Sequence, residues 1–66
     1  MSADDSDAWV SRTAETYRAL RAVPDEDPSR PRLAAFLDVA TSERMRKVGI
    51  DQTITELNEV IHKASG

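Results

Sequence analysis

The sequence predicts an all-α fold, either a small three-helix bundle or an open three-helix arrangement that a partner completes. Apolar residues recur at three- and four-residue spacing in three segments, and no segment keeps the strict alternation of a strand. The breaks between the segments hold proline and glycine, which end helices. We expect a flexible acidic tail at 1–6 and one helical domain at 7–64, with helices at 7–23, 31–48 and 52–64 and a proline-rich loop at 24–30.

The first helix is predicted from its cap and its apolar face. Asp5 or Ser6 can accept hydrogen bonds from the unpaired N–H groups of a first turn, so either can precede the helix. Pro24 ends it, because proline cannot continue a helix, and all three prolines of the chain lie within residues 24–31. The residues expected to share its apolar face are Trp9, Val10, Thr13, Tyr17 and Leu20.

The second helix has an irregular pattern in its second half. Pro31 suits a first turn, and a continuous helix from there places Arg44 in the middle of the apolar stripe. Two interpretations stay open: a break near Thr41 and Ser42, or a continuous helix to Val48 in which Arg44 extends its charged head to water. We favour the continuous helix. Its apolar stripe comprises Leu33, Phe36, Leu37 and Ala40.

Gly49 separates the second and third helices. Glycine enters the left-handed region at little cost, so it is a candidate C-cap. The sequence from Thr53 to Glu56 fits a capping box, which predicts the start of the third helix nearby. Its expected apolar face comprises Ile50, Ile54, Leu57, Ile61 and Ala64, with Val60 beside them.

The chain is short for an independently stable fold. A domain of 66 residues buries only about 60% of its unfolded surface. There is no cysteine for a disulfide or a thiolate zinc site. The remaining route to stability is association with a copy of itself or with another protein.

The net charge and the hydropathy pattern limit the kinds of partner and the cellular location that we expect for this protein. The net charge of −3 disfavours a general binder of nucleic acid or anionic membranes, which needs a basic surface. No apolar run could span a bilayer, and the acidic start of the chain is unlike a signal peptide, so we expect a cytoplasmic protein. Frequent alanine, arginine and aspartate suggest a bacterial, GC-rich source.

The residues that could carry chemistry have simpler explanations. His62 is the only histidine and lies near a helix C-terminus, and without a second histidine or a cysteine it does not make a zinc site. Glu56 and Glu59 are expected on a solvated helix face, where a carboxylate is not tuned for acid–base catalysis. No nucleophile with a base and an orienting acid is evident, so we predict no catalytic site, no metal, no cofactor and no small-molecule substrate.

One segment is basic. Residues 30–47 hold five basic and two acidic residues, and the following Gly49 and helix loosely resemble a helix-turn-helix. The expected third helix, however, presents acidic residues that would repel phosphate. The candidate basic patch is Arg30, Arg32, Arg44, Arg46 and Lys47.

The leading functional hypothesis is a small non-enzymatic protein–protein interaction module: a regulator, adaptor or accessory subunit that binds another protein or itself through an apolar helix face. Trp9 is either core or interface anchor, since tryptophan is frequent in both. The alternatives are a small DNA-binding regulator using residues 30–47 and a precursor peptide modified by a partner enzyme. The candidate contact residues are Trp9, Val10, Tyr17, Val39, Ile54, Leu57 and Ile61.

Overall fold

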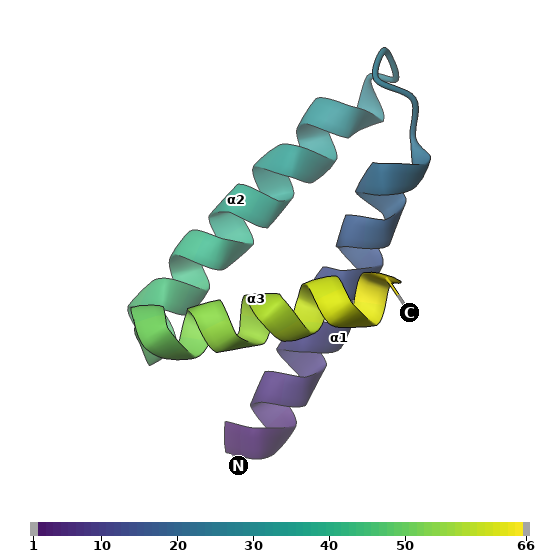
Figure 1. The fold of residues 1–66 in the computed structure, drawn as a ribbon. Coiled ribbons are helices and arrows are strands. Elements are labelled where there is room, and N and C mark those ends of the chain that lie inside the picture. Colours follow the sequence, from purple (N-terminus) through teal and green to yellow (C-terminus); the bar gives the residue numbers. More distant parts are fainter. Residues whose placement is uncertain (1, 66) are drawn as a thin grey trace.

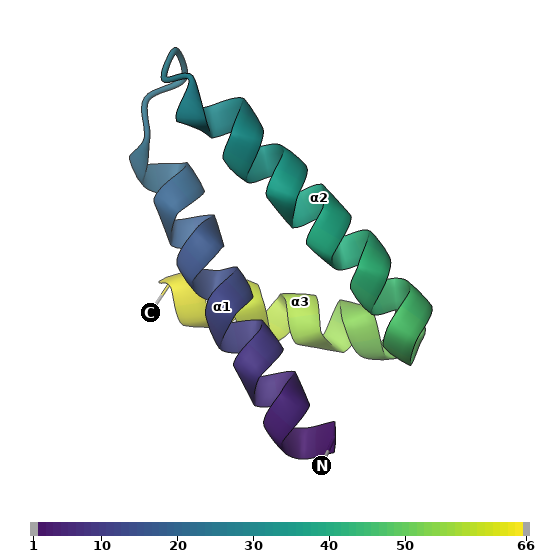
Figure 2. The ribbon, with the colours of Figure 1, turned by 180° about the vertical axis from the view of Figure 1, so that it is seen from behind.

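Residues 2–65 form three helices, as predicted. The computed structural model describes residues 2–65, with side chains described from position 5 onward. Helix α1 (Ser2–Ala22) and α2 (Ser29–Val48) run antiparallel and diverge from the loop that joins them, and α3 (Ile50–Ser65) crosses the open end of this V (Figure 1). Seen from behind, α1 lies in front of α3, so the two helices pack face to face where they cross (Figure 2). Within residues 2–65 there is no strand.

Helix α1 begins earlier than expected. Positions 2–6, predicted as a tail, are helical, so Asp5 and Ser6 lie inside the helix instead of capping it. Asp5 and Asp7 fall in the first turns, where the helix dipole stabilises negative charge. The helix ends at Ala22, two residues before Pro24.

The loop is stabilised by two polar side chains. The Asp27 carboxylate accepts a hydrogen bond of 2.8 Å from the Ser29 backbone N–H at the start of α2, and this bond lowers the pKa of Asp27. The Arg30 guanidinium donates to the carbonyls of Leu20 at 3.2 Å and Val23 at 3.0 Å. It therefore satisfies carbonyl groups that the end of α1 leaves unpaired.

Helix α2 is continuous through Thr41 and Ser42, as we favoured, and ends at Val48. Gly49 follows with φ 94° and ψ 163°, and its N–H donates to the Met45 carbonyl at 2.9 Å. The prediction that Gly49 ends the helix is confirmed, because this positive φ is a conformation that other residues rarely adopt.

Helix α3 begins at Ile50, directly after Gly49, so the predicted capping box is wrong. Thr53 lies within the helix, and its hydroxyl donates to the Gly49 carbonyl at 2.7 Å. This bond satisfies a hydroxyl on a residue that is only 1% exposed. The buried hydroxyl of Thr13 in α1 is satisfied in the same way, because it donates to the Trp9 carbonyl.

The hydrophobic core is small and lies where α1 crosses α3. It consists of Trp9, Val10, Ala14 and Val60, with Tyr17 and Leu57 packed against it. The radius of gyration is 12.1 Å, whereas a typical domain of this length has about 10.8 Å. The bundle is therefore open, with much of its apolar surface outside the core. None of the helices within residues 2–65 has the length and hydropathy needed to cross a membrane.

Candidate interaction surfaces

A buried arginine–glutamate ion pair links α2 to α3, and the same arginine also binds an aspartate of α1. The Arg44 guanidinium in α2 binds the Glu56 carboxylate in α3 through two bonds, Nε to Oε1 at 2.7 Å and Nη2 to Oε2 at 2.8 Å. Only 4% of Arg44 and 2% of Glu56 is exposed. The third guanidinium nitrogen of Arg44, Nη1, donates to the Asp5 carboxylate of α1 at 2.8 Å. We call Asp5, Arg44 and Glu56 the junction triad.

Neutral side chains complete this arrangement. Glu56 Oε2 also accepts hydrogen bonds from the Ser6 hydroxyl at 2.7 Å and the Gln52 amide at 3.0 Å. The Trp9 ring lies beneath the Arg44 guanidinium, 5.4 Å from ring centroid to Cζ, a favourable cation–π distance. Among the described residues no buried side-chain N or O atom lacks a partner. The charges are thus buried in a fully hydrogen-bonded setting, which makes their burial tolerable.

The electrostatics of the junction triad keep both carboxylates ionised. Hydrogen bonding from Arg44 lowers the pKa of Glu56 from its ordinary 4.5 to about 2, against the opposing effect of burial. The same guanidinium, with Lys47 nearby, lowers the pKa of Asp5. The pKa of Arg44 is raised, chiefly by the hydrogen bonds to Glu56. An ionised carboxylate whose oxygens are occupied by donors holds helices together and is poorly placed to move a proton.

Two sequence-based expectations about the junction triad were wrong. Arg44 does not extend to water but turns inward, because Glu56 and Asp5 offer charged acceptors there. Glu56 does not lie on a solvated face, whereas Glu59 is exposed as expected. Arg44 was conspicuous in the sequence as a charge within an apolar stripe, but Asp5, Ser6 and Gln52 carried no signal of their role.

The candidate contact residues separate into two groups. Trp9 is 8% exposed and Val10 is 3% exposed, so both belong to the core, and Tyr17 and Leu57 are half-buried against it. The residues exposed by more than half are Val39 at 56%, Ile54 at 53% and Ile61 at 51%.

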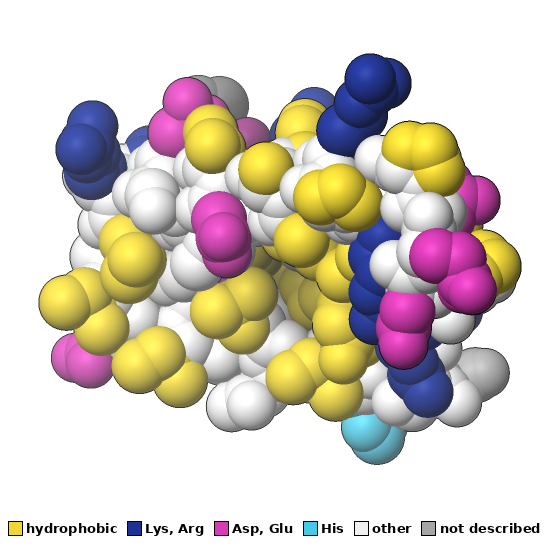
Figure 3. All heavy atoms as spheres, turned by 90° about the horizontal axis from the view of Figure 1, so that it is seen from above, with side chains coloured by type: hydrophobic (Ala, Val, Ile, Leu, Met, Phe, Trp, Pro, Cys, Tyr) yellow, Lys and Arg dark blue, Asp and Glu magenta, His cyan; other side chains and the backbone are white. Residues whose placement is uncertain are grey.

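The apolar face of α3 is mostly turned outward. Ile50 is 62% exposed, and with Ile54 and Ile61 it forms a row at helical spacing. The residues of α3 that face inward are Thr53, Glu56 and Val60. We call Ile50, Ile54, Leu57 and Ile61 the α3 edge, since half-buried Leu57 continues the row. Figure 3 shows hydrophobic side chains spread over one face of the molecule and around a hollow in it.

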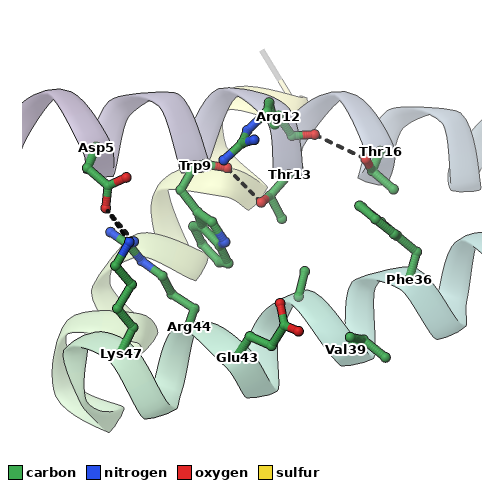
Figure 4. A pocket seen from close by; sticks show the side chains of 11 residues that line it. Asp5, Trp9, Arg12, Thr13, Thr16, Phe36, Val39, Glu43, Arg44 and Lys47 are labelled. Carbon is green, nitrogen blue, oxygen red and sulfur yellow. Dashed lines mark hydrogen bonds and ion pairs between the residues drawn. The ribbon is translucent and has the colours of Figure 1, made fainter.

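A groove lies between α1 and α2. It has a volume of about 510 Å³, with Trp9 and Thr13 on the α1 side and Phe36 and Val39 on the α2 side (Figure 4). Phe36, predicted to belong to the apolar stripe of the second helix, is 58% exposed at this groove. The groove lies where the two helices diverge, and Asp5 and Arg44 of the junction triad line it as well.

His62 is exposed and lines a shallow depression of about 560 Å³ between α1 and α3, together with Asp7 and Glu59. Within the described residues, no cluster of three or more histidine, aspartate or glutamate side chains is arranged to hold a metal ion.

The candidate basic patch does not form one surface. Arg44 is buried, Arg30 is bonded to the end of α1 and lies 3.5 Å from Asp25, and the Lys47 ammonium lies 3.6 Å from Asp5. Arg32 and Arg46 are exposed, on separate turns of α2. Three of the five basic residues therefore have carboxylate neighbours within the fold.

Comparisons with protein-family models, with curated proteins and with solved structures found no match to this chain.

Proposed function

We propose that the protein is a non-enzymatic protein–protein interaction module that binds through the α3 edge. A single observation supports this proposal: the most strongly amphipathic helix of the chain leaves three of its isoleucines more than half exposed. Each fully buried isoleucine contributes roughly 1.5–3 kcal/mol relative to an exposed one. A partner that covers Ile50, Ile54 and Ile61 therefore gains binding energy that the isolated fold leaves unused.

The nucleic-acid alternative has less support. A DNA-binding surface needs several lysine or arginine side chains that reach phosphates together. Here Arg44 is neutralised in the interior, and Arg30 stabilises the loop. No structural feature favours the precursor-peptide alternative, since residues 50–65 form a regular helix.

The proposal can be tested by site-specific photo-crosslinking in cells that naturally produce the protein. A photoreactive phenylalanine analogue at Ile54 or Ile61 should yield covalent adducts with a protein. The same analogue at Arg46, which is exposed on α2, is the control and should yield far fewer. The mass of each adduct reports whether the partner is another protein or the same chain. Absence of adducts at both isoleucines would contradict the proposal.

A further inference from the structure

We propose that the partner on the α3 edge is a second copy of this chain, with the two α3 helices packed antiparallel about a two-fold axis. This inference rests on the proposed function and specifies its partner. Three independent features support it: the spacing of the edge residues, the surface left exposed by one copy, and the charges along the helix.

The spacing of the edge residues is self-complementary. Ile50, Ile54, Leu57 and Ile61 follow one another at intervals of four, three and four, the spacing of the seam of a coiled coil. This order is the same from either end, so an antiparallel copy places Ile50 opposite Ile61 and Ile54 opposite Leu57. A two-fold interface requires such a surface, because each patch must match itself.

The exposed area corresponds to a missing partner surface. One copy exposes 4800 Å², whereas a folded monomer of 7.3 kDa typically exposes about 4,200 Å². The excess of about 600 Å² approaches the roughly 800 Å² that each partner buries in a standard interface. The three exposed isoleucines of the α3 edge contribute to this excess.

The charges along α3 favour the antiparallel orientation. Asp51 lies in the first turn and His62 in the last, and with Asn58 between them they follow one flank of the edge. Antiparallel packing brings Asp51 close to Asn58 and His62 of the other copy, and both are donors for its carboxylate. Parallel packing would instead place this flank of the two copies on opposite sides of the helix pair, so Asp51 would not meet Asn58 and His62 of the other copy. It would also align the two helix dipoles unfavourably.

The absence of cysteine from the chain allows a clean test by disulfide cross-linking of the purified full-length protein. An equimolar mixture of the Ile50→Cys and Ile61→Cys variants should form a mixed disulfide dimer in oxidising buffer. Ile61→Cys alone should remain largely unlinked, since two copies of position 61 would lie about 16 Å apart along the helix axes, beyond disulfide reach. Val39→Cys on α2 is the matched exposed control.

Sedimentation equilibrium provides the second readout. The wild-type chain should be a dimer, Ile61→Asp should raise its dissociation constant by about tenfold or more, and Val39→Asp should leave it unchanged. Efficient cross-linking of Ile61→Cys with itself would overturn the antiparallel geometry. A wild-type monomer without cross-links would overturn the dimer. The proposed function would survive that result if Ile54 in cells still cross-linked to a different protein, and would fail with it if no adduct formed.

Discussion

The junction triad places charged residues in the interior, whereas the α3 edge places apolar residues on the surface. At the junction, a charged arginine and glutamate are almost fully buried, whereas on the edge three isoleucines are more than half exposed. Both regions involve the same helix, and a single rotation of α3 about its axis determines both. A completed ion pair can therefore determine which side of a helix faces inward, even against its hydrophobic pattern.

The physical reason lies in what each alternative would leave unpaired. Turning α3 so that its isoleucines face inward would move Glu56 away from Arg44. An uncompensated charge in the interior is far more costly than an isoleucine in water. A partner that binds later can cover exposed isoleucines. The same partner would not restore a buried ion pair that the fold itself had separated.

The largest expected effect comes from removing the cation of the junction triad. Arg44→Met should lower the free energy of unfolding by about 3–5 kcal/mol, because it leaves Glu56 buried without its partner. Urea unfolding followed by circular dichroism measures this loss. Arg46→Met, two residues away and exposed, is the control and should change stability by less than about 0.5 kcal/mol. Equal effects of the two variants would show that the junction triad does not orient α3.

Acid should weaken the junction and leave the apolar edge unaffected. Because the pKa of Glu56 is lowered from 4.5 to about 2 on folding, its stabilising contribution is complete above pH 4.5 and is lost as the pH falls towards 2. The lowered pKa values of Asp5 and Asp27 act in the same direction. The urea midpoint should therefore be level near neutral pH and fall between about pH 5 and 2.

A matched variant identifies the source of this acid transition. Glu59→Gln removes an exposed carboxylate of the same helix and should leave the fall in the urea midpoint in place. A midpoint that stays level down to pH 2 in the wild-type protein would contradict the role assigned to Glu56.

The turn before α3 should contribute a smaller effect. Gly49→Ala should lower stability by about 1–3 kcal/mol, since φ 94° and ψ 163° form a combination that only glycine adopts readily. A Cβ at this position meets nothing within 4 Å, so the loss would be purely conformational. Val48→Ala, next to the turn, measures loss of packing alone. A neutral Gly49→Ala would indicate that the turn does not direct the chain into α3.

The smallest effects separate the two sides of α3 most directly. Val60→Ala should lower the stability of the monomer by about 1.5 kcal/mol, because two buried methyl groups are lost from the core. Its neighbour Ile61 is half-exposed, so Ile61→Ala should cost under about 0.5 kcal/mol in dilute solution and instead weaken association. Thermal unfolding at low and high protein concentration distinguishes the two. The opposite order of stability loss would mean that α3 is rotated the other way.

The local features of the sequence were sufficient to predict the elements of this fold. Three amphipathic periods gave three helices, Pro24 and Gly49 lie at the two breaks, and the second helix continues through Ser42. Each of these outcomes depends on the conformational preferences of a few adjacent residues. The helix starts were less predictable: α1 and α3 begin before the expected capping residues, because favourable capping indicates a start without excluding an earlier one.

The candidate surfaces were predictable only in part. Ile54 and Ile61 were recognised as contact candidates, but the same list included Trp9 and Val10, which lie in the core, and Glu56 was assigned to the solvent. Periodicity defines the apolar side of a helix, but not which part of that side meets its neighbours.

The helices, their order, the absence of disulfides and the shortage of apolar core follow from residue type and local spacing alone. The tertiary structure alone decided that Arg44 would find Glu56 and Asp5, and that the α3 edge would remain open. Those residues lie 12 and 39 positions from Arg44, and such pairings depend on how whole helices cross. Once they cross, the requirement to pair a buried charge outweighs the tendency of three isoleucines to avoid water.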